Sequence, residues 1–139
     1  MTTVEEALEG TTPLAQKVRA GGPYRSTAEL IAQMRALLPT LTEDEKVVTL
    51  NAHPRIGEDP SRLSTRSLQE QGDDTIPELE RLNAEYEGRF GFRFVVFVNH
   101  RPKSEIVELL RRRLGRSRAE EMEEGLQAIV DIAADRLRS

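Results

Sequence analysis

The stretch SRAEEMEEGLQAIVDIAADRLRS, residues 117–139, decides the fold class. Ser117 and Glu120 have the spacing of a capping box, in which a serine oxygen accepts from a free N–H of the first helical turn and a glutamate three residues later reaches back. Apolar residues then recur with the period of one helix face. They are Met122, Leu126, Ile129, Val130, Ala133 and Leu137. The stretch therefore predicts a long helix that packs one face against a core.

The same start signal occurs three more times, as STAE (26–29), TEDE (42–45) and TIPE (75–78), and each precedes apolar residues at helical spacing. The stripes that follow are Leu30, Ile31, Met34, Leu37 and Leu38; Val47, Val48 and Leu50; and Leu79, Leu82, Tyr86 and Phe90. A further stripe is Ile106, Val107, Leu109, Leu110 and Leu114. Gly91 and Gly115 follow two of these stripes and are expected as C-terminal caps. Residues 1–20 predict only one weak helix, around Val4 to Leu8, and a poorly defined approach to Gly21.

One segment breaks the helical pattern. Residues 92–98, FRFVVFV, are aromatic and β-branched and favour a strand, yet the chain holds no second segment of this kind to pair with it. We expect either a buried extended connection or the start of a helix that residue propensities fail to indicate. The purely structural alternative is a segment that fills the core. Its backbone groups need partners, which a ligand could supply. The sequence thus predicts an all-α protein, a single-domain helical bundle over 1–139 with one buried extended segment near 92–98.

The composition excludes several classes of function. The chain has 20 Lys and Arg against 24 Asp and Glu, which argues against a nucleic-acid-binding domain. The local basic run of Arg111, Arg112 and Arg113, with Arg116 and Arg118, is interpreted as a solvated helix end rather than a polyanion site. With no cysteine and only two histidines, a disulfide, a thiolate nucleophile and a histidine zinc site are not expected.

No membrane span or secretory signal is expected. No uninterrupted apolar run approaches the ~20 residues that cross a bilayer. The N-terminus lacks a basic region followed by an apolar stretch. We expect a cytoplasmic protein without a membrane or nucleic-acid partner.

His53 is the first candidate for chemistry. Pro54 disfavours helical conformation in the residue before it, so the helix that starts after Thr42 should end near His53. This position would expose the imidazole at a helix terminus, where the dipole favours the protonated form. A capping or half-buried structural histidine is the alternative. His100, beside Arg101 and Pro102, is interpreted as a loop residue rather than a ligand.

A second candidate is SLQEQ, residues 67–71. On a helix, Ser67, Glu70 and Gln71 share one face, so a hydroxyl, a carboxylate and an amide could together recognise a polar heterocycle. An ordinary solvated helix face is the alternative interpretation.

Taken in order, these segments resemble the OHCU decarboxylase family of urate degradation, whose substrate is 2-oxo-4-hydroxy-4-carboxy-5-ureidoimidazoline (OHCU). The resemblance rests on His53-Pro54, then SLQEQ (67–71), then FGFRFV (90–95), and covers roughly residues 37–137. Leu82, Asn83 and Tyr86 belong to it, as does RLG (113–115). Each motif alone is weak, but three in order are fairly specific.

The resemblance implies an all-α fold, no cofactor, no metal, a homodimer and conversion of OHCU to (S)-allantoin and CO2. It implies that His53 is the catalytic acid/base and that Glu70 is the main polar anchor at the catalytic centre. The substrate-binding residues that it implies are Pro54, Ser67, Leu68, Gln69, Glu70, Gln71, Phe94, Val95, Val96, Phe97 and Val98. Contacts from residues 94–98 would be made largely by backbone groups.

Two other functions stay open on the sequence. One is a non-enzymatic helical interaction module in which His53 is structural. The other is a decarboxylase of a related ureide or hydantoin acid.

Overall fold

The computed structural model describes residues 2–56 and 77–138. Their helices are α1 (Val4–Ala7), α2 (Pro13–Gly21), α3 (Thr27–Leu37), the 3₁₀ turn η1 (Leu38–Thr40), α4 (Glu43–Asn51), α6 (Pro77–Phe90), α7 (Lys103–Arg113) and α8 (Arg118–Arg138). No strand occurs within these two described ranges, so the predicted all-α class is confirmed. None of the described helices is long and apolar enough to cross a membrane.

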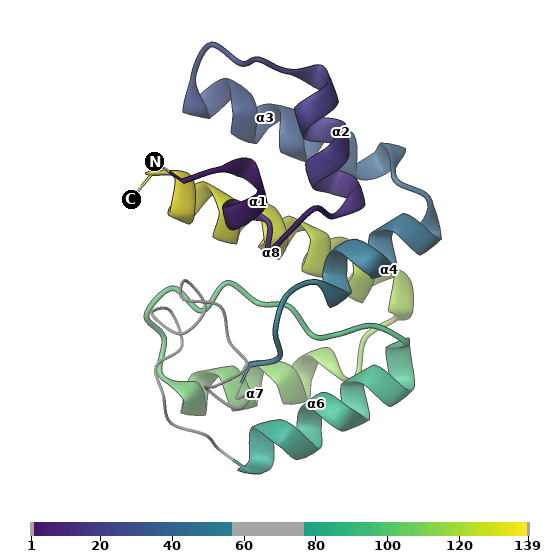
Figure 1. Cartoon of the computed structure of the whole chain (residues 1–139). Helices are drawn as coiled ribbons and strands as arrows, with labels where there is room; N and C mark the ends of the chain where they lie inside the picture. The colour runs from purple at the N-terminus through teal and green to yellow at the C-terminus, as the bar shows by residue number, and fades with distance from the viewer. Residues whose placement is uncertain (1, 57–76, 139) are drawn as a thin grey trace.

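Helix α8 is the central element of the bundle (Figure 1). Helices α1, α3 and α4 pack against it, α2 packs on α3 and α4, and α6 pairs with α7. Eight of its residues from Gly125 to Ala134 are buried, which confirms the apolar face predicted from the sequence. Gly125 lets α4 approach, because a Cβ built there would lie 2.8 Å from Leu50 Cδ2.

The predicted helix starts have different outcomes. Thr42 forms a reciprocal capping box with Glu45, and Ser117 forms one with Glu120. Ser26 caps α3 by accepting from the Glu29 N–H, but the Glu29 carboxylate accepts from Arg25 N instead of reaching back to Ser26. Thr75 lies outside the described residues.

The expectation for residues 1–20 is wrong in part. Helix α1 matches the weak helix predicted near Val4, but the segment before Gly21 is the well-formed helix α2. Thr12 caps it by accepting from Ala15 N at 3.1 Å, and Pro13 occupies the first turn, where a missing N–H is harmless. Its apolar face is short, with only Leu14, Ala15 and Val18 buried, so periodicity alone is a weak signal there.

Residues 92–98 form the predicted extended connection between α6 and α7. Helix α6 ends at Phe90 and is followed by Gly91, whose φ of 83° is a left-handed conformation that suits glycine. Phe92 and Phe94 then pack with the buried ring of Tyr86, whose centroid lies 5.3 Å from that of Phe94. The segment is thereby fixed against α6 on one side.

Candidate active site

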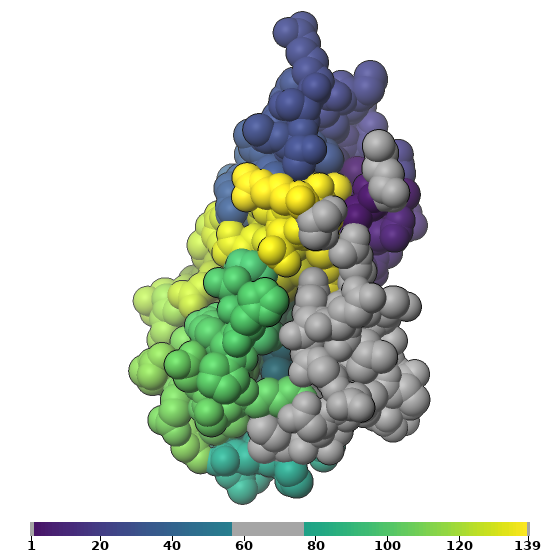
Figure 2. All heavy atoms as spheres, turned by 90° about the vertical axis from the view of Figure 1, so that its left-hand side faces the viewer, coloured from purple at the N-terminus to yellow at the C-terminus, as the bar shows by residue number. Residues whose placement is uncertain are grey.

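The extended segment, the end of α4 and the last turns of α8 enclose one pocket. Its lining residues are His53, Pro54, Ile56, Phe94, Val95, Val96, Phe97, Val98, Asn99, His100, Ile132, Asp135 and Arg136. Figure 2 shows the green atoms that follow residue 95 beside the yellow C-terminal turns of α8 on one face of the molecule. His53, Pro54 and residues 94–98, chosen from the sequence, are therefore brought together. Ser67, Leu68, Gln69, Glu70 and Gln71 lie outside the described residues.

His53 is buried, which corrects the expectation of an exposed imidazole. Helix α4 ends at Asn51, as Pro54 predicts, but the His53 side chain turns inward and is 3% exposed. Its pKa is lowered from 6.5 to about 4, first by burial and then by the positive charge of Arg136. Glu9 and the Thr49 backbone act in the opposite direction, although neither ring nitrogen meets hydrogen-bond geometry with any described residue. His53 is thus neutral near neutral pH, and neither ring nitrogen is hydrogen-bonded within the described residues.

The chain around His53 is held from two sides. The Arg93 guanidinium donates to the carbonyls of Asn51 and His53, at 3.0 and 3.1 Å, and Arg93 N donates to the Asn51 side chain. Beyond the histidine, Arg55 pairs with Glu87 of α6 at 2.6 Å. Asn83 of α6 donates to the Ile56 carbonyl at 2.7 Å. These contacts fix the position of the imidazole relative to the extended segment.

Arginines satisfy the carbonyl groups of the extended segment. Arg113 donates to Val95 O at 3.3 Å, and Arg101 donates to Phe97 O and Val98 O at 2.6 and 3.1 Å. The N–H groups of residues 94–98, by contrast, have no hydrogen-bond partner within the described part of the chain. Since these residues line the pocket, their donors are available to a ligand.

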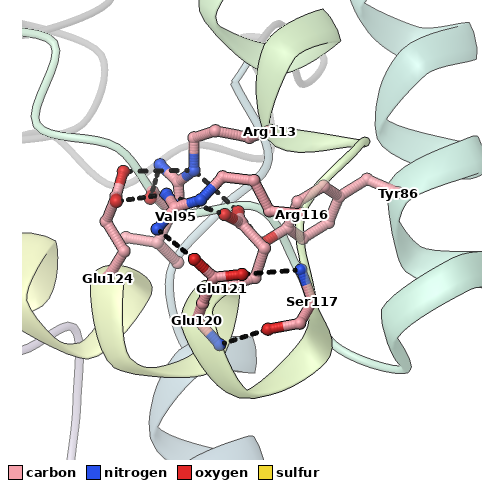
Figure 3. A network of polar contacts seen from close by, with 8 residues as sticks. All are labelled: Tyr86, Val95, Arg113, Arg116, Ser117, Glu120, Glu121 and Glu124. Carbon is pink, nitrogen blue, oxygen red and sulfur yellow. Dashed lines mark hydrogen bonds and ion pairs between the residues drawn. The ribbon is translucent and has the colours of Figure 1, made fainter.

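Arg113 belongs to a buried polar network behind this segment (Figure 3). Its Nε lies 2.7 Å from Glu121 Oε1, which also accepts from the Tyr86 hydroxyl at 2.8 Å. The guanidinium stacks over the Phe94 ring, 4.7 Å from its centroid. Burial and the bond to Glu121 raise the pKa of Tyr86 well above its ordinary value. Arg113 therefore corrects the expectation that the whole basic run is solvated, whereas Arg111 and Arg112 are exposed.

Arg116 and Arg118 are also engaged rather than simply solvated. Arg116 lies 3.1 Å from Glu121 Oε2 and pairs with Glu124. Arg118 pairs with Glu43, donates to Phe90 O at 2.9 Å and lies over the Phe92 ring. Within the basic run, Arg118 thus holds the end of α6, Arg113 holds the extended segment, and Arg116 pairs with α8.

The sequence analysis missed the contribution of α8 to the pocket. Arg136 is 2% exposed and is the charge that acts on His53, while Ile132 and Asp135 complete that wall. A sequence signal for Arg136 exists: it follows Ile129 by seven residues and Ala133 by three, which is a core position of the helix face. His100 lies in the turn after the segment, as predicted, but also reaches the pocket wall.

The sequence is similar to one protein family and to several individual proteins. The profile of a protein family described as OHCU decarboxylase matches residues 1–138. The chain is 29% identical over 132 residues to the 2-oxo-4-hydroxy-4-carboxy-5-ureidoimidazoline decarboxylase of Haloferax volcanii, covering 89% of the chain and 78% of that protein. It is 28% identical over 138 residues to the uric acid degradation bifunctional protein of Bacillus sp. (strain TB-90), covering 94% of the chain but only 27% of that longer protein.

Two solved structures share the fold. A crystal structure of OHCU decarboxylase in the presence of (S)-allantoin matches with a TM-score of 0.75 and 23% identity, over 98% of this chain and 96% of that one. A crystal structure of (S)-allantoin synthase matches with a TM-score of 0.72 and 22% identity, over 97% of this chain and 47% of that one.

Proposed function

The chain belongs to the OHCU decarboxylase family, and on that basis we propose that it converts OHCU to (S)-allantoin and CO2 in urate degradation. The observation that carries the proposal is the single pocket in which His53, Pro54 and residues 94–98 meet a buried arginine. A small polar ureide needs such a pocket, apolar in most of its lining and with a few fixed polar groups.

The chemistry needs an acid/base group rather than a cofactor. When the carboxyl group leaves as CO2, the electron pair of the broken bond flows into the neighbouring C=N bond of the ring. The ring nitrogen, which takes the negative charge of the lost carboxylate, picks up one proton from water. One group must also accept the hydroxyl proton, and a proton must then be delivered to the adjacent carbon on one face. His53 is proposed for both steps, since a neutral imidazole accepts a proton and returns it, a contribution of typically ~10²–10⁴-fold.

Arg136 is proposed to bind the substrate carboxylate. It is the buried cation of the pocket, and guanidinium groups bind carboxylates through paired hydrogen bonds. A bound carboxylate also offsets the charge that lowers the pKa of His53, so it raises the pKa of the imidazole towards neutrality. The free N–H groups of residues 94–98 are proposed to hold ring and ureido oxygens.

The role of Ser67, Leu68, Gln69, Glu70 and Gln71 in binding the ring and the ureido group stays a prediction from the resemblance, with Glu70 as the main polar anchor. A homodimer is likewise proposed on the resemblance alone, and the cytoplasmic location stays a prediction from the sequence. Light scattering on the purified protein tests the dimer.

The decisive experiment follows freshly generated OHCU by absorbance and the product by circular dichroism. We expect wild-type protein to accelerate OHCU loss and to give optically active (S)-allantoin, and the His53→Asn protein to do neither while keeping its helical spectrum. No acceleration by folded wild-type protein would support the interaction-module alternative. Turnover only of a related ureide or hydantoin acid would support the other alternative.

A further inference from the structure

The side chain of Arg136 is held by the N-terminal segment of the chain. Its Nη1 donates to the carbonyls of Glu6 and Ala7, at 3.0 and 3.4 Å, and its Nη2 donates to Glu9 Oε1 at 2.9 Å. The side chains of Arg136 and Glu9 are 2% and 10% exposed. The guanidinium is therefore fixed between α8 on one side and α1 with the residues that follow it on the other.

Glu9 has an unusual backbone conformation for a residue with a side chain. Its φ of 62° lies in the left-handed region, and it is followed by Gly10 at φ 127°. Gly10 N donates to Glu5 O at 2.8 Å, which closes the turn, and the buried side chains of Ala7 and Leu8 anchor it in the core. Such conformations persist where the surroundings fix them and occur often at functional sites.

The same carboxylate acts on the proposed catalytic base. Arg136 and Glu9 shift the pKa of His53 in opposite directions, so both charges lie within electrostatic range of the imidazole. Asp135, the next carboxylate on this wall, lines the pocket but is exposed. Among the described residues, Glu9 is thus the nearly buried carboxylate that opposes the charge of Arg136.

We propose that Glu9 is a positioning residue, which holds the Arg136 guanidinium in the pocket wall in the orientation that receives the substrate carboxylate. The inference rests on the proposed function, in which Arg136 binds that carboxylate. A misplaced guanidinium would weaken binding of the substrate, which carries the carboxylate, and spare binding of the product, which has lost it.

The test compares Glu9→Gln and Glu9→Asp with the control Glu5→Gln. Glu5 lies in α1, four residues before Glu9, and pairs with Arg19 at 2.7 Å, but that arginine is 57% exposed and outside the pocket. We expect Glu9→Gln to raise the KM for OHCU about ten- to hundredfold, with a smaller change in kcat. Glu9→Asp, which keeps the charge, should recover part of the loss, and Glu5→Gln should match wild type.

Calorimetric titration with (S)-allantoin gives the second readout. We expect the product Kd of Glu9→Gln to stay within about threefold of wild type, as for an interaction that the product cannot make. An equal loss of substrate and product binding, with a lowered Tm, would show a merely structural pair and overturn the inference. If Glu9→Gln does not fold, Glu9→Asp carries the same comparison.

The two proposals fail in different ways. If wild-type protein does not turn over OHCU, the proposed function fails whatever Glu9 does. If wild-type protein is active and Arg136→Met loses activity while Glu9→Gln behaves as wild type, only the positioning role is wrong.

Discussion

The guanidinium of Arg113 and the carboxylate of Glu121 lie 2.7 Å apart with side-chain exposures of 3% and 0%. One partner ends α7 and the other lies in the first turn of α8, and the pair supports Val95 and Phe94 from behind the pocket. A buried pair of this kind contributes little net stability as a whole, but removal of one partner leaves an uncompensated charge.

Arg113→Met should therefore destabilise the fold strongly. We expect a loss near the lower end of the roughly 3–5 kcal/mol seen when one member of a buried pair is removed, because Arg116 also lies 3.1 Å from Glu121. Arg111→Met is the control, since Arg111 is 47% exposed and should cost less than about 1 kcal/mol. Urea unfolding measures both, and equal losses in the two variants would contradict the prediction.

The double variant Arg113→Met with Glu121→Gln should recover most of that loss. The glutamine lacks the negative charge that Glu121 would carry without Arg113, and its side-chain oxygen can still accept from the Tyr86 hydroxyl. Recovery in a double-mutant cycle measures the coupling between the two positions, and additive losses would mean that they act independently.

The free energy of unfolding should fall on acidification through His53. The pKa of this imidazole is about 4 in the folded protein and near 6.5 in the unfolded chain. Between these two pH values the imidazole is protonated in the unfolded state but neutral in the folded state, which favours unfolding. The stability difference is present above about pH 6.5 and is lost towards pH 4, at up to about 1.4 kcal/mol per pH unit. Urea unfolding of wild type and His53→Asn from pH 7 to 4.5 tests this; identical slopes would contradict it.

Two helical glycines should respond to alanine in opposite directions. At Gly88 an added Cβ meets nothing within 4 Å, so Gly88→Ala should stabilise α6 by about 0.5–1 kcal/mol. At Gly125 the Cβ would lie 2.8 Å from Leu50 Cδ2, so Gly125→Ala should destabilise and displace α4. Thermal unfolding measures the Tm of both variants. A higher Tm for both would contradict the prediction, because it would show that α4 shifts at no cost in stability.

Turnover should survive exhaustive treatment with metal chelators. The substrate supplies its own electron sink, and within the described ranges no group of three or more His, Cys, Asp or Glu could hold a metal ion. Activity that disappears with chelator and returns with added zinc would overturn this prediction.

The sequence predicted what depends on local chemistry. Capping residues and apolar spacing located α3, α4, α7 and α8, and Pro54 located the end of α4, because these signals act within a turn or two of the chain. His53 and residues 94–98, chosen from the sequence, line one pocket, but the burial of His53 was not predicted, since it depends on α8, which lies far along the chain. Arg113 and Arg136 were missed because a charge is normally assigned to solvent. Each occupies a core position of its helix face, where only a tertiary partner makes it tolerable.

The contact between Glu9 and Arg136 joins residues 127 positions apart, and Arg136 lines the pocket together with His53. Contacts of such long sequence separation are entropically the hardest to close during folding. Helices such as α3 and α4, whose hydrogen bonds are local, can form much sooner. A refolding chain should therefore regain its helical spectrum before it regains turnover, so that catalysis reports the joining of the two ends.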